Sequence, residues 1–395
     1  MVEWKTIKVG DIGQIITGKT PKTSNGSYYG GEIPFLTPSD DMSVKYVRNT
    51  KKNITEEGRL SVKNATLPPD TVCVSCIGSD LGKVVITTEM TVTNQQINSI
   101  VIDEDNYDID YIYYSMVELG KILNFHSKTS TAVPIVNKSS FSQYELKCPP
   151  LDIQKKIGEV LSSIDSKIEE NDNINKNLEA QAQAYFDELF VVNADPNWSE
   201  CTLSDIGSVV AGGTPSKSKP EYYADQGIAW ITPKDLSVNK SKFISHGEND
   251  ISELGFSKSS AAKMPAGTIL FSSRAPIGYI AIAQNEVTTN QGFKSVIPNE
   301  NISTAYMYFL LKNLLPTIEG MASGSTFKEI SGTAMKSVPT VMPDADTIQL
   351  FNSFCKPVFK EQEILEAENQ RLSALRDSLL PKLMSGELDV SNIEL

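Results

Sequence analysis

The chain has 395 residues, 40% of them hydrophobic, and a formal net charge of −13. This length and composition are typical of a globular protein with two substantial cores and exclude a disordered chain. The excess of acidic residues argues against strong stand-alone binding to nucleic acid, because the phosphate backbone is itself anionic.

The acidity is concentrated in two connecting segments. Residues 1–150 carry 15 basic and 17 acidic side chains, and residues 198–342 carry 12 of each. Segments 151–197 and 343–395 together carry 9 basic and 20 acidic side chains. Each near-neutral domain could therefore present a basic face, although DNA binding would need the help of a partner.

The apolar segments and the cysteines of the sequence indicate where the protein is located and whether it binds a metal. The chain lacks both a signal peptide at its start and any run of about 18 uncharged apolar residues, which predicts a cytoplasmic protein without membrane contact. Its five cysteines are odd in number and scattered, as expected in a reducing compartment. Cys73 and Cys76 have the spacing of a zinc knuckle, but the second half of the chain has Leu270 and Ser273 there, so we predict no metal site.

Nearly all of residues 1–192 has a counterpart about 195 positions later, in unchanged order. A unit of this size is a domain with its own core rather than a solenoid repeat. The matched motifs are Gly18-Lys-Thr-Pro21 with Gly212-Gly-Thr-Pro215, Phe35-Leu-Thr-Pro-Ser-Asp40 with Trp230-Ile-Thr-Pro-Lys-Asp235, and Thr93-Asn-Gln95 with Thr289-Asn-Gln291. We predict a pseudo-two-fold α+β fold with two similar β-rich domains.

Short β-rich segments punctuated by Gly and Pro come first in each copy, and a helix follows late. The matched strands are 70–75 with 267–272 and 83–87 with 279–283, and the matched helices are 109–125 and 304–315. The predicted domains are residues 1–150 and 193–342, each followed by a helix, at 151–192 and 343–388, with a tail at 389–395.

The two connecting helices are predicted from apolar residues that alternate at spacings of three and four. The first begins at Asp152 as N-cap, runs to Phe190 and contains one polar intruder, Asn171. The second begins at Asp346, with Gln349 placed as in a capping box, and Pro357 should kink or split it. Neither helix can leave its apolar stripe in water, so we expect them to pair as an antiparallel coiled coil.

The paired helices would set the distance between the two domains and offer their remaining surface to partner subunits; the alternative is an ordinary helical linker. The candidate spacer and partner-binding residues are Ile157, Ile164, Ile168, Leu178, Leu365, Leu372, Leu375 and Leu379.

One enzyme motif is present: Gly13-Gln-Ile-Ile-Thr-Gly-Lys-Thr20 satisfies the P-loop pattern at every position. A phosphate-binding P-loop needs a helix that begins at its Gly-Lys-Thr, but Pro21 biases Thr20 away from helical geometry. The second copy has Gly213 in place of the lysine. We therefore favour a tight turn after a strand over a nucleotide site.

Other catalytic constellations are missing. The only two histidines, His126 and His246, are not paired by the repeat, so they build no symmetrical triad or metal cluster. Methyltransferase and nuclease signatures fail too. We predict a chain without catalytic residues or a cofactor of its own.

Loops in both copies offer hydroxyl, amide and cationic side chains, which suit contacts with phosphates and base edges. Turn capping or a solvated surface explains each of them equally well, and the Thr-Asn-Gln triplet could instead bridge two backbone strands. The candidate DNA contacts are Lys19, Lys22, Lys128, Ser130, Thr131, Lys217, Lys219, Lys234, Arg274, Gln291, Lys294, Ser325, Thr326 and Lys328.

Several motifs occur together: the openings Trp4…Asp-Ile-Gly13 and Trp198…Asp-Ile-Gly207, then Gly-Gly-Thr-Pro215, Trp230-Ile-Thr-Pro-Lys-Asp235, Ser273-Arg-Ala-Pro-Ile-Gly278, Thr289-Asn-Gln-Gly-Phe293 and Leu379-Leu-Pro-Lys-Leu-Met-Ser-Gly-Glu-Leu388. With them the whole chain resembles the specificity subunit of type I restriction-modification enzymes. The first copy departs from the pattern at Lys19, Ser79-Asp80 and Gln96, where the second has Gly213, Ala275-Pro276 and Gly292.

The resemblance implies a non-catalytic protein in which each target-recognition domain reads one half of a split sequence in double-stranded DNA. It also implies two methyltransferase subunits that modify a flipped adenine with S-adenosylmethionine, and restriction subunits that use ATP and Mg²⁺. Those cofactors would belong to the partners. We expect half-sites roughly 10 base pairs apart, centre to centre. The alternatives are a targeting subunit of another methylation-based anti-phage system and a P-loop NTPase.

Overall fold

The computed structural model describes residues 4–78, 81–129, 135–274, 276–324 and 328–391, with only the backbone for 126–129. The chain forms two compact units. Unit 1 is Met1–Glu169 with Gln370–Leu395, and unit 2 is Glu170–Asn369. Each unit therefore holds one copy of the repeat together with part of both long helices.

The domain of unit 1 is built on a five-stranded sheet in the order β2-β10-β7-β8-β4 and a four-stranded sheet in the order β5-β3-β9-β6. A small pair, β1 with β11, joins the ends of the domain. The strands are β1 (Lys5–Lys8), β2 (Gly13–Thr17), β3 (Tyr29–Leu36), β4 (Tyr46–Val47), β5 (Asn53–Ile54), β6 (Thr66–Leu67), β7 (Val72–Ser75), β8 (Val84–Thr87), β9 (Thr91–Thr93), β10 (Ile97–Ile102) and β11 (Glu145–Cys148). The helices are α1 (Glu56–Ser61), α2 (Ile109–Thr129) and α3 (Lys138–Ser142).

The domain of unit 2 repeats this topology, with one sheet in the order β13-β21-β18-β19-β16, a second in the order β14-β17-β15-β20, and the pair β12-β22. The strands are β12 (Ser199–Thr202), β13 (Gly207–Ala211), β14 (Tyr223–Ala224), β15 (Ile228–Ile231), β16 (Phe243–Ile244), β17 (Asn249–Ile251), β18 (Ile269–Ser273), β19 (Ile277–Ala283), β20 (Thr288–Thr289), β21 (Lys294–Pro298) and β22 (Pro339–Met342). The helices are α5 (Leu203–Ile206), α6 (Pro233–Val238), α7 (Glu253–Ser257), α8 (Thr304–Asn313), α9 (Leu315–Met321) and α10 (Gly332–Lys336). The predicted duplication, strands and late helices are confirmed.

The core of each unit lies between the five-stranded sheet, the late helix and the long helices. In unit 1, Ile112 and Met116 of α2 are fully buried with Ile157 and Leu161 of the first long helix. In unit 2, Phe309 of α8 is fully buried against Phe186 and Phe351 of the long helices. Burial of each such side chain contributes ~1.5–3 kcal/mol, so both long helices are integral parts of the two cores.

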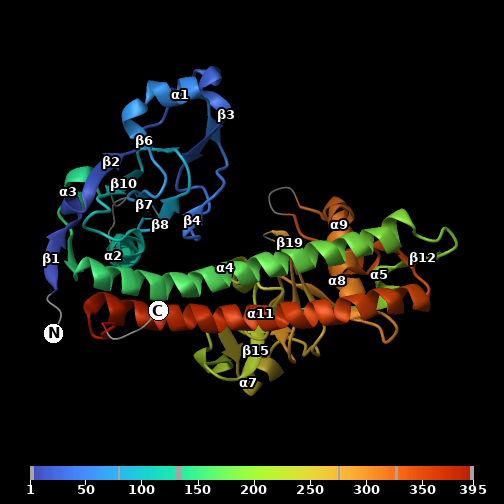
Figure 1. Cartoon of the computed structure of the whole chain (residues 1–395). Coiled ribbons are helices and arrows are strands. Elements are labelled where there is room, and N and C mark those ends of the chain that lie inside the picture. The colour runs from blue at the N-terminus through green and yellow to red at the C-terminus, as the bar shows by residue number, and fades with distance from the viewer. Residues whose placement is uncertain (1–3, 79–80, 130–134, 275, 325–327, 392–395) are drawn as a thin grey trace. The chain divides into compact units, whose positions relative to one another are not determined.

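The two long helices are α4 (Leu151–Asp187), extended by a π-helical turn over Glu188–Val192, and α11 (Ala345–Ser385). Within unit 1, Asp165 of α4 accepts a hydrogen bond from Arg376 of α11 at 2.7 Å. Within unit 2, Tyr185 of α4 packs on Phe354, with ring centroids 4.8 Å apart. Late residues of α4 thus meet early residues of α11, which confirms the antiparallel pairing (Figure 1).

The predicted polar intruder, Asn171, is completely buried in this pair. Its amide donates to the carboxylate of Glu368 at 2.8 Å and to the side-chain oxygen of Asn369 at 2.9 Å. A buried amide needs such partners, and these two lie only at one register of the pair.

Several details predicted for the helices are wrong. Pro357 does not split α11, which is continuous from Ala345 to Ser385, because it lies on the exposed side, where water can reach the carbonyl of Ser353 that loses its N–H partner. Asp152 lies inside the first turn of α4, and the carbonyl of Pro150 accepts the first helical bonds. The N-cap of α11 is Asp344, whose carboxylate accepts from Thr347 N at 2.8 Å, rather than Asp346.

The apolar stripe of α11 is also displaced from the predicted one. Leu350 and Leu375 are about half exposed, whereas the neighbouring Ile348, Phe351 and Leu380 are buried. The shift arises because each helix packs against a domain as well as against the other helix, so two overlapping stripes are buried. Ile157 and Ile164 of α4 and Leu365 of α11 are buried as predicted, and Ile168, Leu178, Leu372 and Leu379 are half-buried.

Candidate DNA interface and domain anchors

The repeated motifs meet at one place in each domain. Gly212 packs so tightly on the Thr-Asn-Gln turn that a Cβ atom there would lie 2.0 Å from the carbonyl oxygen of Asn290. The equivalent atom on Gly18 would lie 2.1 Å from the carbonyl oxygen of Asn94. Only glycine permits this close approach of two backbones, which explains why the glycine is present in both copies.

Hydrogen bonds then connect the same loops. Thr20 donates to Gln95 Oε1 at 2.7 Å, and Thr214 donates to Gln291 Oε1. The backbone N–H of Gly213 donates to the carbonyl of Thr289 at 2.8 Å, and the indole of Trp230 donates to the carbonyl of Gly213 at 3.0 Å. We call these joined Gly-x-Thr-Pro and Thr-Asn-Gln loops the motif cluster.

The P-loop pattern belongs to this cluster. Residues 13–17 form β2, and residues 18–20 continue as an irregular loop rather than as the start of a helix. The backbone N–H of Lys19, which a P-loop would direct at phosphate, donates to the carbonyl of Thr93 at 2.8 Å. The local structure therefore lacks the phosphate-binding geometry.

The Thr-Pro-x-Asp motif forms a capped turn in both domains. Asp40 Oδ2 accepts from the backbone N–H of Thr37 at 2.7 Å, and Asp235 Oδ2 accepts from that of Thr232 at 2.7 Å. In unit 2 the turn starts α6 and carries Lys234, whose exposed ammonium lies 2.6 Å from Glu248. The motif residues are thus a scaffold, and the variable position between Pro and Asp, Ser39 or Lys234, is exposed.

At one end of the five-stranded sheet the two domains differ. Arg274, directly after β18, pairs with Glu329 at 3.3 Å, and the ammonium of the buried Lys294 lies 3.6 Å from the same carboxylate. Arg274 and Glu329 also form an isolated β-bridge, and Ile77 and Ile135 form the equivalent bridge in unit 1. One domain therefore presents a charged pair where the other presents two apolar side chains.

Of the two cysteines with knuckle spacing, Cys73 lies in β7 and Cys76 directly follows that strand, and their side chains belong to different core clusters. Burial raises the pKa of Cys73 to about 12 and that of Cys76 to about 11. Thiols of this kind are poor metal ligands, because the thiolate is the binding form. Among the described residues there is no group of three or more His, Cys, Asp or Glu that could hold a metal.

The chain matches the family described as "Type I restriction modification DNA specificity domain" over residues 1–180 and 196–374, one match for each copy. It belongs to this family. As a type I specificity domain protein, it is similar to the MjaIX specificity subunit of Methanocaldococcus jannaschii, at 38% identity over 46% of this chain and 44% of the relative. It is also 23% identical to the HindI specificity subunit of Haemophilus influenzae over 98% of this chain and all of that protein.

A solved structure shares the fold of this specificity subunit. The type I S subunit from M. genitalium superposes with a TM-score of 0.61 at 16% identity, covering 97% of this chain and 96% of that one. None of the described helices is long and apolar enough to cross a membrane.

The structure places the candidate DNA contacts of the specificity subunit unevenly. Lys19, Lys22, Lys217 and Lys328 are exposed. Lys219, Lys234 and Arg274 are held by carboxylates, Gln291 belongs to the motif cluster, and Lys294 is buried. Ser130, Thr131, Ser325, Thr326 and the side chain of Lys128 lie outside the described residues. DNA contact by any of these residues stays a prediction.

Two lysines were missed in the sequence. Lys45, directly before β4, and Lys242, directly before β16, have side chains only 8% and 6% exposed. The available signal was a lysine followed by an aromatic and a β-branched residue in both copies, Lys45-Tyr-Val47 and Lys242-Phe-Ile244. We call these two residues the anchor lysines.

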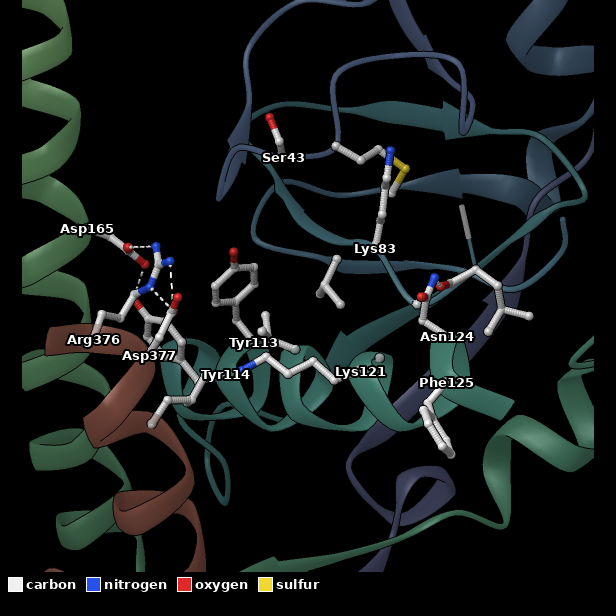
Figure 2. Close-up of a pocket in the computed structure, with 17 residues that line it drawn as sticks. Ser43, Lys83, Tyr113, Tyr114, Lys121, Asn124, Phe125, Asp165, Arg376 and Asp377 are labelled. Atoms are coloured by element: carbon white, nitrogen blue, oxygen red, sulfur yellow. Dashed lines mark hydrogen bonds and ion pairs between the residues drawn. The ribbon is translucent and has the colours of Figure 1, made fainter. Parts of the chain in front are cut away.

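Unit 1 also contains a cavity of about 610 Å³ beside α2. Figure 2 shows Arg376 between Asp165 and Asp377 at one end of it and Phe125 at the other. Lys121 at its wall pairs with Glu118 at 2.7 Å. These charged side chains of the wall are thus engaged by their own neighbours, and no ligand is assigned to the cavity.

Proposed function

We propose that this specificity subunit reads a bipartite, asymmetric sequence in double-stranded DNA, one half with each recognition domain, and has no catalytic activity of its own. The observation that carries the proposal is the pair of motif clusters. A closely similar scaffold occurs twice, while the side chains around it differ, as expected of two readers with different half-sites.

The helix pair supports the second part of the proposal, in which α4 and α11 set the gap between the half-sites and bind the partner subunits. Both helices contribute to both cores, so neither is a loose tether. Their acidic, partly apolar outer surface, which includes the half-exposed Leu350 and Leu375, would dock two methyltransferase subunits and, through them, restriction subunits. S-adenosylmethionine, ATP and Mg²⁺ would be held by those partners.

Genome-wide mapping of methylated adenine tests the proposal directly. The chain is expressed with its cognate methyltransferase subunit in a host that lacks other adenine methylation. We expect methylation at one asymmetric motif of two specified blocks around several unspecified bases. Methylation without such a motif, or a single continuous motif, would contradict the proposal.

A matched insertion tests the spacer role. Because α4 and α11 are paired, seven residues must be added to both, between Glu170 and Asn171 and between Asn369 and Gln370. Two extra turns add about 10.5 Å, which corresponds to roughly three base pairs. We expect a longer gap with the same specified blocks, and altered blocks at an unchanged gap would exclude the spacer role. Insertion into α4 alone is the control and should abolish activity, because it shifts the pairing register.

A further inference from the structure

The anchor lysines occupy equivalent positions in the two domains. The carbonyl of Lys45 accepts from Ile86 N at 2.7 Å, and the carbonyl of Lys242 accepts from Ile282 N at 2.7 Å. Strands β4 and β16 are in both cases the edge of the five-stranded sheet and run parallel to their neighbours β8 and β19. The same backbone position therefore carries a buried cation twice.

Each ammonium group lies among three aromatic rings. Lys45 Nζ is 5.2 Å from the ring centroid of Tyr46, 5.4 Å from that of Tyr113 and 4.9 Å from that of Tyr114. Lys242 Nζ is 4.8 Å from Tyr308, 5.5 Å from Phe309 and 4.2 Å from Phe359. Cation–π attraction of this kind is strongest where water is excluded.

Hydrogen bonds and ion pairs connect each anchor lysine to the long helices. In unit 1, Lys45 lies 2.7 Å from Asp110 and donates to Ser162 of α4 at 2.6 Å, and Ser162 in turn donates to Asp110 at 2.6 Å. The neighbouring Tyr114 donates to Asp165 of α4 at 2.5 Å. The edge strand and α2 are thereby tied to the long helix at two adjacent turns.

In unit 2 the bonds reach both long helices. Lys242 pairs with Glu179 of α4 and donates to Gln362 of α11 at 2.6 Å. Glu366 of α11 accepts from the backbone N–H of Lys242 at 2.7 Å and from that of Phe243 at 3.1 Å. Burial lowers the pKa of Lys242. Burial also acts to raise the pKa of Glu179, but the neighbouring Lys242 and Lys312 outweigh it, so the pKa of Glu179 is lowered.

A buried ion pair is a poor source of stability, because replacing it by apolar groups of similar volume is often neutral or stabilising. Its partners must, however, meet at one geometry. An apolar contact tolerates sliding by a residue or two, whereas a buried ammonium that slides loses its hydrogen bonds and leaves an unpaired charge. The duplicated position thus points to orientation rather than to stability.

We propose that Lys45 and Lys242 are positioning residues that fix the orientation of each recognition domain on the helix pair and thereby set the gap that the subunit accepts between its two half-sites. This inference rests on the proposed function. It adds that the gap depends on two side-chain anchors and not on helix length alone.

The test replaces the anchor of unit 2 by the apolar variant Lys242→Met with Glu179→Gln. A plasmid library carries the two specified blocks of the wild-type target at the wild-type gap and at gaps one base shorter and longer. Methylation of each site is measured with the variant in complex with its methyltransferase subunit. We expect methylation at the changed gaps to rise about tenfold relative to the wild-type gap, with unchanged blocks, which corresponds to about 1.4 kcal/mol of lost discrimination.

The matched control is Lys263→Met with Glu286→Gln, a surface pair in the same domain at 3.1 Å, which should leave the gap preference unchanged. A folded anchor variant, verified by thermal unfolding, that keeps the wild-type gap would overturn the inference. If the unit 2 variant fails to fold, Lys45→Met with Asp110→Asn makes the same test in unit 1. Absence of any bipartite motif with the wild-type subunit would instead refute the proposed function itself.

Discussion

The two recognition domains share their motif cluster and differ at one end of the five-stranded sheet. The motif cluster has an equivalent threonine–glutamine hydrogen bond in both units, from Thr20 to Gln95 and from Thr214 to Gln291. At the end of the five-stranded sheet, the apolar bridge of Ile77 and Ile135 corresponds to the charged bridge of Arg274 and Glu329. The comparison shows which residues duplication has preserved for folding and which have diverged, and the diverged ones are the better candidates for sequence recognition.

The largest expected effect concerns the shared scaffold. The variant Gly212→Ala places a Cβ atom 2.0 Å from the carbonyl oxygen of Asn290, and overpacking against the backbone should destabilise the domain by about 3 kcal/mol. Thermal unfolding measures this effect. Gly320→Ala in the same domain is the control, because no atom lies within 4 Å of its added Cβ. An unchanged melting temperature for Gly212→Ala would show that the motif cluster is not a rigid scaffold.

The next effect concerns Arg274, at the end of the five-stranded sheet where the two domains differ. If Arg274 reads a base, Arg274→Ala should weaken discrimination at one position of one half-site by ~1–3 kcal/mol and leave the other half-site unchanged. Methylome mapping with the variant measures both half-sites at once. A uniform loss of methylation without any change of motif would assign Arg274 to phosphate contact or folding instead.

A smaller effect is expected in the helix pair. Asn171→Ala removes the two hydrogen bonds that the buried Asn171 amide donates to Glu368 and Asn369, and should lower the free energy of unfolding by about 1–2 kcal/mol. Asn173→Ala, on an exposed position of the same helix, serves as the control. Equal stabilities of the two variants would mean that Asn171 does not contribute to the pairing.

The smallest effect is a pH dependence of the ion-pair network around Glu179 in unit 2. The pKa of Glu179 is lowered from 4.5 by Lys242 and Lys312 against the opposing effect of burial. Its stabilising contribution is therefore complete above about pH 4.5 and is lost as pH falls through the folded-state pKa. The stability difference between wild type and Glu179→Gln should narrow in acid, as measured by urea unfolding. If the stability difference did not change with pH, the charge of the Glu179 carboxylate would not contribute to the stability of unit 2.

Much of the fold could be predicted from the sequence because the pattern of each helix and strand occurs twice, once in each copy of the repeat. The strands and the late helices recur with the same apolar pattern, and the antiparallel pairing follows from two long apolar stripes. The stripe of α11 was misplaced at Leu350 and Leu375, because periodicity does not separate the face buried by a domain from the face buried by the partner helix.

The candidate site was less predictable. Gln291 and Lys294 have side chains suited to DNA, yet one bonds to the motif cluster and the other is buried beside Glu329. Composition does not reveal whether a polar side chain serves the interior or the surface. The anchor lysines were overlooked for the same reason, since a buried lysine is rare and only its aromatic surroundings, distant in sequence, distinguish it.

The last turns of α11 and the residues that follow them have a consequence for biosynthesis. Leu380, Leu383 and Val390 belong to the core that also contains Val9 and Ile12, so this core stays open until residue 390 has left the ribosome. Unit 2 closes with Asn369 and needs no later residue. The domain that is translated second is therefore the first that can bury its whole core, and apolar surface of the amino-terminal domain stays exposed until residues 380–390 have been synthesised.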